Sequence, residues 1–202
     1  MDWLSYEKQA YEKGYSVVCG VDEAGRGPLA GPVYAAAVIL PPDAHIEGVN
    51  DSKKLSEKKR ETLFDIIRQT AVSSCIASAS VEEIDTHNIL NATYLAMQRA
   101  VAGLSPQPQM VLVDGNRLPS LPMEAQAIVK GDSLSLSIAA ASILAKVSRD
   151  RYMKELARQY PQYQLEKHKG YGTKLHRELI RQYGPSPIHR KTFLKKILGE
   201  SL

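Results

Sequence analysis

Short apolar runs alternate along this chain with longer segments of helical character. The runs cover residues 16–21, 33–40, 72–81, 109–114 and 125–129. Runs of this length, bounded by proline, glycine or charged residues, are typical of β-strands. Strands that alternate with helices predict an α/β fold in which helices pack on a mixed sheet. The 202 residues are expected to form one domain, residues 1–202.

The remaining segments carry helix signals. Ser56 is the expected N-cap of a helix that runs to residue 69, and Gly103 is expected to close a helix over residues 88–102. Further helices are predicted over residues 1–14, 134–160 and 174–183, and within residues 191–198.

Positive charge is concentrated near the C-terminus. Residues 161–202 contain nine Lys or Arg against three Glu, in a chain whose formal net charge is +4. A basic extension beside an acidic remainder indicates that the protein docks a polyanion. A solvated basic tail is the alternative that charge alone leaves open.

The sequence predicts a cytoplasmic protein with no membrane association. No apolar run has transmembrane length, and the first residues lack the basic and then apolar build of a signal peptide. Cys19 and Cys75 lie in expected strands without metal-ligand spacing, which predicts buried thiols in a reducing compartment.

Acidic residues stand at the ends of three expected strands. Asp22 and Glu23 close the first strand, Asp114 closes the fourth, and Asp132 follows the fifth. Side chains at strand ends converge in open α/β sheets. Four converging carboxylates repel one another unless cations bind, and oxygen ligands suit Mg²⁺ or Mn²⁺ rather than zinc. Two such ions can activate a water and stabilise the leaving oxygen of a phosphodiester.

Two of these acids have structural alternatives. Asp132 precedes a helix and can serve as its N-cap, and Asp114 followed by Gly115 is a common turn signal. The adjacent pair Asp22 and Glu23 has no comparable structural task. The recurrence of acids at three strand ends therefore favours a metal site.

A Gly-Arg-Gly turn, formed by Gly25, Arg26 and Gly27, follows the first acidic pair. Glycine lets the backbone approach a ligand closely, and arginine can donate to two phosphate oxygens. Farther along, residues 167–173 combine basic residues and glycines with Tyr171, which can stack on a base or sugar. A tyrosine in such a turn is more often structural.

These motifs together resemble bacterial ribonuclease HII, the type 2 ribonucleases H. The match runs from about Gly14 to Phe193 and begins with the stretch GVDEAGRGPLAGPV. The other matching segments are residues 51–55, 113–115, 130–132, 137–147, 170–173 and 186–190.

The resemblance implies a ribonuclease H-like fold, with a mixed five-stranded sheet flanked by helices and a basic helical C-terminal extension over about residues 161–202. It implies endonucleolytic cleavage of the RNA strand of RNA–DNA hybrids and 5′ of ribonucleotides embedded in duplex DNA, leaving a 3′-hydroxyl and a 5′-phosphate. These two nucleic acids are the expected partners of a monomeric enzyme. The expected cofactor is Mg²⁺ or Mn²⁺, with two ions when substrate is bound. Ribonucleotide excision from DNA and RNA primer removal are the expected roles.

The resemblance also implies site residues. Four match the family's metal-binding catalytic carboxylates: Asp22, Glu23, Asp114 and Asp132. Three match the motif that senses the 2′-hydroxyl at an RNA–DNA junction: Gly25, Arg26 and Gly27. Tyr171 matches the tyrosine that stacks beside the junction. Lys53 and Lys130, in two further matching motifs, are expected to contact substrate, although the segment around Lys53 also has the pattern of a capped, solvated loop.

Two other functions share part of this pattern. Another nuclease, a resolvase or an integrase on the same fold also clusters carboxylates, and a nucleic-acid-binding protein without catalysis also has a basic extension. The Gly-Arg-Gly turn and Tyr171 favour the ribonuclease over other nucleases. Intact carboxylates at all four positions favour an enzyme over a binding protein.

Overall fold

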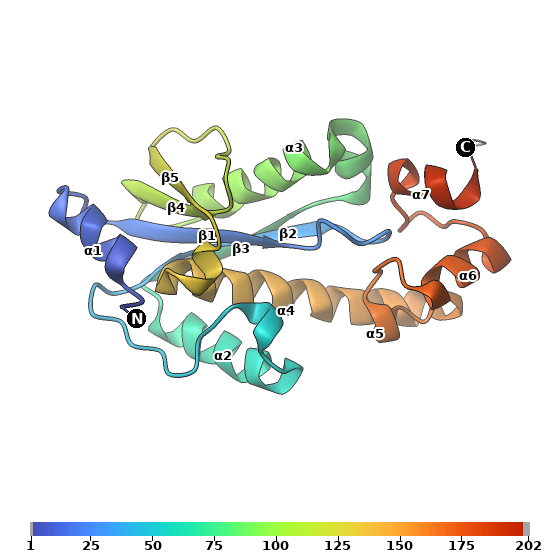
Figure 1. The fold of residues 1–202 in the computed structure, drawn as a ribbon, viewed down its shortest axis with the longest axis horizontal. Coiled ribbons are helices and arrows are strands. Elements are labelled where there is room, and N and C mark those ends of the chain that lie inside the picture. The colour runs from blue at the N-terminus through green and yellow to red at the C-terminus, as the bar shows by residue number, and fades with distance from the viewer. Residues whose placement is uncertain (1, 200–202) are drawn as a thin grey trace.

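The computed structural model describes residues 2–199; residue 1 and residues 200–202, which the sequence assigns to the same domain, lie outside this part. Its centre is a five-stranded sheet in the order β3-β2-β1-β4-β5 (Figure 1). The strands are β1 (Val18–Ala24), β2 (Val33–Ile39), β3 (Ser73–Ala79), β4 (Met110–Asp114) and β5 (Glu124–Ile128). β2 pairs antiparallel with β1 and β3, whereas β1, β4 and β5 run parallel. The predicted mixed five-stranded sheet is thereby confirmed.

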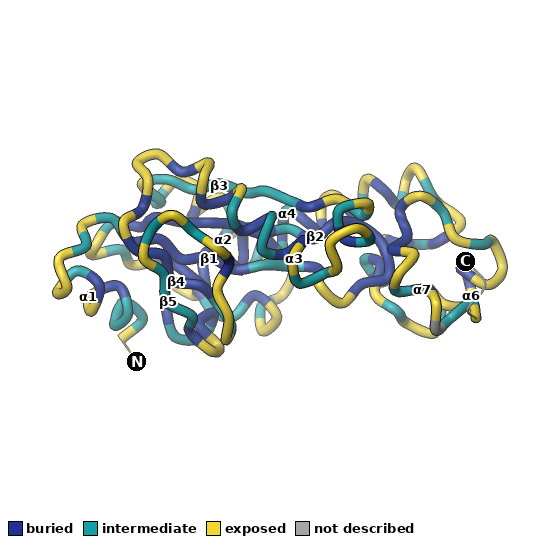
Figure 2. Tube along the Cα trace, turned by 90° about the horizontal axis from the view of Figure 1, so that it is seen from above, coloured by how far each residue is buried: buried dark blue, intermediate teal, exposed yellow. Residues whose placement is uncertain are grey.

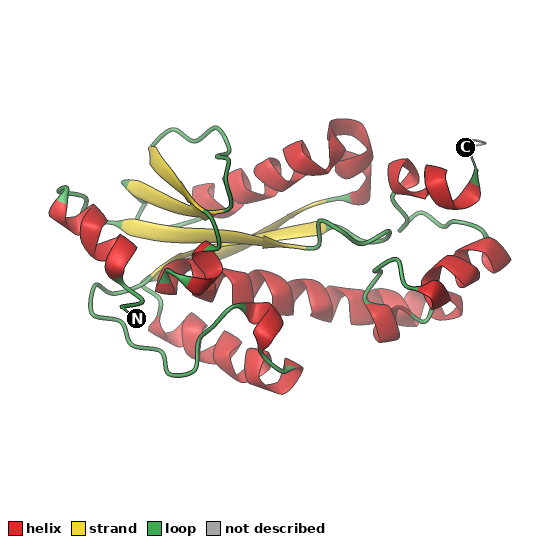
Figure 3. Cartoon of the chain, viewed as in Figure 1, coloured by secondary structure: helices red, strands yellow, loops and turns green. Residues whose placement is uncertain are grey.

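Helices cover both faces of the sheet (Figures 1 and 3). Helix α3 (Val81–Ala102) covers one face, and α4 (Leu136–Gln159) with α2 (Glu57–Thr70) covers the other. Because side chains alternate along a strand, Val21 of β1 packs toward α3. On the opposite face, Gly20 lies against the backbone of α4, where a Cβ would overlap Ser137. This close approach sets the first turn of α4 beside the middle of β1.

The structure confirms some predicted boundaries and corrects others. Ser56 caps α2 by accepting a hydrogen bond from the Lys59 N–H, as predicted. Helix α3 begins at Val81 rather than at residue 88, because Ser80 and Glu83 form a capping box there. Asn88 lies at a kink within α3, with φ of 65°, and its side chain accepts from two following N–H groups. The predicted start was therefore a second, internal cap.

The C-terminal extension packs on the far end of α4 (Figures 1 and 2). It contains η3 (Pro161–Tyr163), α5 (Leu165–His168), α6 (Lys174–Tyr183) and α7 (Lys191–Leu198). The short α5 was not predicted, because one turn has no detectable period. Leu165, Ile180 and Leu194 bury their side chains against Met153 of α4 and its neighbours, so the extension has an apolar core of its own.

The N-terminal helix α1 (Ser5–Glu12) is shorter than predicted and lies at the opposite end of the sheet (Figure 1). Glu7 of α1 is buried, and its Oε1 accepts hydrogen bonds from the hydroxyl groups of Ser135 and Ser137 at the start of α4. Among residues 2–199, no helix is long and apolar enough to span a bilayer.

Candidate active site

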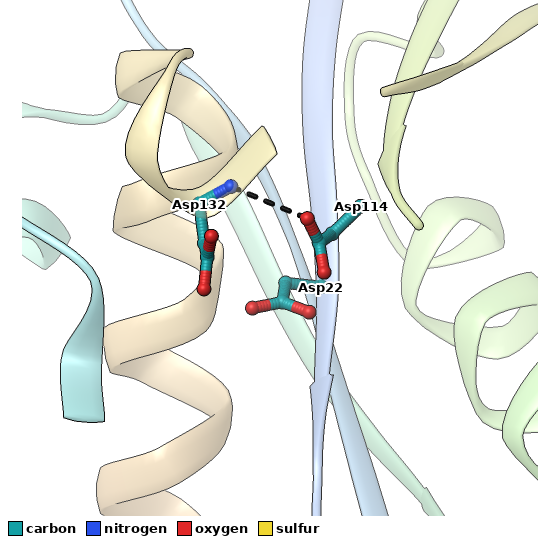
Figure 4. A group of neighbouring side chains, drawn as sticks. All are labelled: Asp22, Asp114 and Asp132. Atoms are coloured by element: carbon teal, nitrogen blue, oxygen red, sulfur yellow. Dashed lines mark hydrogen bonds between the residues drawn. The ribbon is translucent and has the colours of Figure 1, made fainter. Parts of the chain in front are cut away.

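Three of the predicted carboxylates meet at one edge of the sheet (Figure 4). Asp22 comes from β1, Asp114 is the last residue of β4, and Asp132 lies in the short helix η2 (Gly131–Ser133) that precedes α4. One carboxylate oxygen from each residue lies within 4.8 Å of those of the other two. We call these three residues the carboxylate cluster.

The first strand was predicted over residues 16–21, with Asp22 and Glu23 closing it. In the structure β1 runs to Ala24, so both acids lie within the strand. β4 pairs with β1 only as far as the Val21–Val113 pair, whereas β2 stays paired alongside Asp22 and Glu23. Asp22 therefore stands on a strand held from one side only, above the end of β4. The site lies in the space that the shorter strand leaves open.

Glu23 is not a member of the carboxylate cluster in the structure. Strand alternation turns it to the face of the sheet opposite Asp22. There it borders a pocket of about 300 Å³ together with Asp114 and Arg26. The Arg26 guanidinium donates to Glu23 Oε1 at 3.4 Å. Asp114 thus belongs to the carboxylate cluster and also borders the Glu23 pocket.

Electrostatics in the cluster favour cation binding. Burial, followed by the charges of Glu23 and Asp114, raises the pKa of Asp22 well above its usual range. Burial and the Asp114 charge also raise the pKa of Asp132. Burial alone would lower the pKa of Lys53, but the charges of Asp22 and Asp132 raise it. Carboxylates that resist ionisation when gathered in this way gain most from a bound cation.

The donor set suits a hard divalent ion. Every side chain of the carboxylate cluster offers oxygen, and within the described residues no histidine or cysteine joins it. Oxygen donors are the ligands that Mg²⁺ and Mn²⁺ prefer. The Lys53 ammonium lies 3.8 Å from Asp132 Oδ2, on a side chain that is 79% exposed. The exposed Lys53 ammonium adds a positive charge beside the cluster.

The structural alternatives for Asp132 and Asp114 have different outcomes. Asp132 is not the N-cap of α4, because Ser135 accepts the capping hydrogen bond from Ile138. The turn after Asp114 is present, since Gly115 has φ of 111° and its N–H donates to Ile128. The Asp114 side chain nevertheless points toward Asp22 and Asp132, and its Oδ1 accepts a hydrogen bond from the Asp132 N–H at 3.3 Å (Figure 4).

The Gly-Arg-Gly turn and Tyr171 lie side by side. A Cβ on Gly27 would be 3.9 Å from the Tyr171 ring. Gly25 has φ of 97°, and a Cβ there would overlap the Arg149 side chain, so the turn requires glycine at this position. Tyr171 is 42% exposed, and Lys146 Nζ and Arg149 Cζ lie within 6 Å of the centre of its ring. Residues separated by more than 140 positions thus form one surface beside the cluster.

The two predicted lysines differ in placement. Lys53 lies in the short helix η1 (Ser52–Lys54) and reaches the cluster. Lys130 has a left-handed backbone with φ of 59° and an exposed side chain immediately before η2. It is close to Asp132 in the chain, and its side chain faces solvent.

Several buried or half-buried polar residues near the site were not predicted. Ser142 of α4 donates to the Ser52 hydroxyl at 2.8 Å, and its hydrogen bonding lowers the pKa of Asp22. Arg60 donates to the backbone oxygens of Ser52 and Leu55, which holds the segment that carries Lys53. Ser142 lies in a matching motif, but a serine among alanines and leucines gives no signal of the face it occupies.

Comparison with known proteins adds three findings. The family model described as Ribonuclease HII matches residues 19–196. Proteins named Ribonuclease HII from Caldicellulosiruptor bescii and Vibrio campbellii are 54% and 58% identical, covering 98% and 94% of this chain and 96% and 90% of those proteins. The crystal structure of ribonuclease H2 from Pyrococcus horikoshii OT3 is similar, with a TM-score of 0.75 and 30% identity over 90% of this chain and 96% of that one. These similarities confirm the predicted fold class.

Proposed function

The chain belongs to the ribonuclease HII family and is a ribonuclease H, and from this premise we propose the reaction that its site performs. The enzyme cleaves the RNA strand of RNA–DNA hybrids and cuts 5′ of ribonucleotides embedded in duplex DNA, leaving a 3′-hydroxyl and a 5′-phosphate. The observation that carries the proposal is the juxtaposition of the carboxylate cluster with the Gly25–Gly27 turn.

The carboxylate cluster holds the divalent ions in this proposal. Asp22, Asp114 and Asp132 supply oxygen ligands, and Glu23 joins them from the neighbouring pocket. Bound Mg²⁺ or Mn²⁺, two ions with substrate present, supplies water activation and charge neutralisation at the leaving oxygen. The protein fixes the positions of these ligands through β1, β4 and η2, which keeps the acids close together despite their repulsion.

The turn and Tyr171 select the substrate. A 2′-hydroxyl distinguishes RNA from DNA and can both donate and accept a hydrogen bond. The glycines allow backbone groups to approach it where a Cβ would collide. Tyr171 presents an exposed ring to the sugar or base beside the junction. Gly25 follows Glu23 by two positions, so recognition and cleavage are coupled over a short distance.

Basic side chains bind the phosphate backbone without reading sequence. Lys53 and Lys130 flank Asp132, and the extension contributes further lysines and arginines. Such contacts predict affinity that falls as salt is raised. We further propose that residues 1–202 act as one monomeric catalytic domain in the cytoplasm, in ribonucleotide excision and primer removal.

One assay tests the reaction directly. Purified protein is incubated with duplex DNA holding one ribonucleotide, an all-DNA duplex, and a long RNA–DNA hybrid, each with Mg²⁺, Mn²⁺ or EDTA. Cutting of the first and third substrates, only with metal, is expected. Cutting of the all-DNA duplex indicates a general nuclease instead, and binding without cutting indicates a non-catalytic protein.

The sensor role is tested separately by Arg26→Ala. This change should lower the rate on a single embedded ribonucleotide by about tenfold, because one charged hydrogen-bond donor near the substrate is lost. The matched control is Arg68→Ala, an exposed arginine on α2. An unchanged rate for Arg26→Ala contradicts the assignment of this side chain.

A further inference from the structure

The segment 186–190 belongs to the recognised motifs, yet the proposed chemistry gives it no task. Its backbone pairs with the residues that follow the Gly-Arg-Gly turn. The Gly31 N–H donates to Ile188 O at 2.8 Å, and the Arg190 N–H donates to Leu29 O at 2.9 Å. The extension is thus fastened to the polypeptide between β1 and β2, beside the turn.

The Arg190 side chain then reaches back to the turn itself. It is fully buried and donates to the backbone oxygens of Gly25 at 2.6 Å, Arg26 at 2.9 Å, Pro28 at 2.8 Å and Gly31 at 2.9 Å. The planar guanidinium has five N–H donors in a fixed arrangement, which matches this ring of acceptors. One side chain therefore fixes the course of the entire loop.

The direction of these hydrogen bonds decides what the turn offers to a ligand. In a trans peptide, the C=O of one residue and the N–H of the next point in opposite directions. The carbonyls of Gly25 and Arg26 point at Arg190, so the N–H groups of Arg26 and Gly27 point away from it. Arg190 thereby turns the donors of the loop outward.

A second buried arginine extends the arrangement to the Tyr171 side. Arg149 of α4 donates to the backbone oxygens of Ala30 and Pro32 and to that of Lys169, two residues before Tyr171. It joins the loop after β1 to the loop after α5. The loop between β1 and β2 is consequently held by Arg149 from α4 and by Arg190 from the extension.

Histidine side chains connect the extension to Tyr171. His189 Nδ1 accepts from the Ser186 N–H, so its proton is on Nε2, which lies 3.2 Å from His176 Nε2. His176 Nε2 must then accept, and its Nδ1 donates to the Tyr171 backbone oxygen at 3.0 Å. Each ring is neutral, with its tautomer set by the next partner. We call Arg149, Arg190, His176 and His189 the arginine–histidine network.

We propose that His189 and Arg190 are positioning residues that align the two halves of the substrate-reading surface, the turn through Arg190 and Tyr171 through His189 and His176. The inference rests on the proposed function of the turn and Tyr171. Two adjacent residues of the extension then set the distance between two parts of the surface that come from opposite ends of the chain.

Arg190→Lys tests the proposal, because lysine keeps the charge but replaces the planar fork with a single ammonium. We expect kcat on a duplex with one ribonucleotide to fall by about tenfold or more, since misplacement of a reading group by roughly 1 Å has effects of this size. A long hybrid presents a 2′-hydroxyl in every register, so its kcat should fall less. Stabilisation of the protein by Mn²⁺ should not change, because the carboxylate cluster is untouched.

His189→Leu is the second variant, and it keeps the proposal testable if Arg190→Lys does not fold. It removes the link to His176 and puts an apolar side chain of similar size in place of the imidazole, and a smaller shift in the same ratio of kcat values is expected. The matched control is Ile180→Val, which shortens a fully buried side chain in the core of the extension and removes none of the hydrogen bonds that hold the two loops.

All rates are compared at equal folded fraction. The proposal is overturned if the ratio of kcat values for the two substrates stays at the wild-type level in both positioning variants, or if Ile180→Val shifts it equally. Failure of the proposed function has a different signature, because the wild-type protein itself would then not cut the single-ribonucleotide duplex.

Discussion

The carboxylate cluster buries negative charges and the arginine–histidine network buries positive ones. The two regions differ in whether the protein itself supplies partners for these charges. In the cluster, Asp22 and Asp132 face another acid, and burial raises their pKa values. In the network, burial lowers the pKa values of Arg149 and Arg190, but each guanidinium is enclosed by backbone oxygens. Against three acids the first region has the exposed ammonium of Lys53, and a bound cation can supply the positive charge that is still missing. The second is satisfied within the protein and serves as architecture.

The largest effect should come from Asp22→Asn, which removes one potential negative charge from the carboxylate cluster. Cleavage should fall by about 10³-fold, since charge stabilisation by a bound metal contributes several kcal/mol to the transition state. Hybrid binding should persist, because phosphate contacts lie elsewhere. The metal-free variant should also be more stable than the wild type, because the cost of burying the Asp22 charge and its repulsion with Glu23 and Asp114 are removed.

Single-turnover cleavage and urea unfolding measure these two consequences. The exposed Asp43, changed to Asn, is the matched control and should alter neither. Full activity of Asp22→Asn excludes Asp22 as a metal ligand. A loss of stability in the metal-free protein would show that the cluster is satisfied internally, which would remove the contrast with the network.

Arg149→Met removes one of the two buried guanidinium groups of the arginine–histidine network. The change leaves the backbone oxygens of Ala30, Pro32 and Lys169 without their donor, so the free energy of unfolding should fall by about 2 to 4 kcal/mol. Arg158→Met, an exposed site on the same helix, should change it by less than about 0.5 kcal/mol. Urea unfolding with both variants decides the matter, and equal values for the two would contradict an architectural role for Arg149.

Addition of Mn²⁺ tests in one experiment whether the carboxylate cluster, and not the arginine–histidine network, binds the ion. At a hundredfold excess over the dissociation constant, a ligand that binds only the folded state adds about 2.7 kcal/mol to its stability. Wild type and Arg149→Met should both gain this stabilisation, and Asp22→Asn should lose most of it. Thermal unfolding with and without EDTA provides the measurement. An equal gain in all three proteins would place the ion outside the carboxylate cluster.

The carboxylate cluster was more accessible to prediction from the sequence than the network. Asp22, Asp114 and Asp132 each follow an apolar run of the sequence, and the parallel pairing of β1, β4 and β5 brings the ends of these runs together. The acids could therefore be grouped from the order of elements alone. The position of Glu23 could not be predicted, because the strand was expected to stop at residue 21. Neighbouring residues alternate between the two faces only within a strand, so the opposite placement of Asp22 and Glu23 was not foreseen.

The arginine–histidine network has no comparable sequence signal. Arg190 bonds to oxygens of the backbone, which every residue has, so no pattern of partner side chains points to it. His176 and His189 come together only after α6 reverses the chain. The early start of α3 was missed for a local reason, since the apolar pattern before its kink at Asn88 is weak.

The neutral histidines of the network predict the smallest effect, a dependence of stability on pH. Burial lowers the pKa of His176 and of His189 to about 4, from an ordinary value near 6.5. Below 6.5 the unfolded chain takes up protons that the folded protein does not bind until about pH 4. Their contribution is therefore complete above pH 6.5 and is lost as pH falls, by about 1 kcal/mol for each ring between pH 7 and 5.5.

The carboxylate cluster has the opposite slope in the metal-free protein, because its raised pKa values favour the folded, protonated form as pH falls. The His176 contribution is isolated by subtracting the unfolding free energies of His176→Gln from those of the wild type at each pH. The cluster is common to both proteins and cancels, so the difference should shrink from pH 7 to pH 5.5. A difference that stays constant would mean that the folded protein protonates these rings normally, and the fixed tautomers that connect His189 to Tyr171 would not exist.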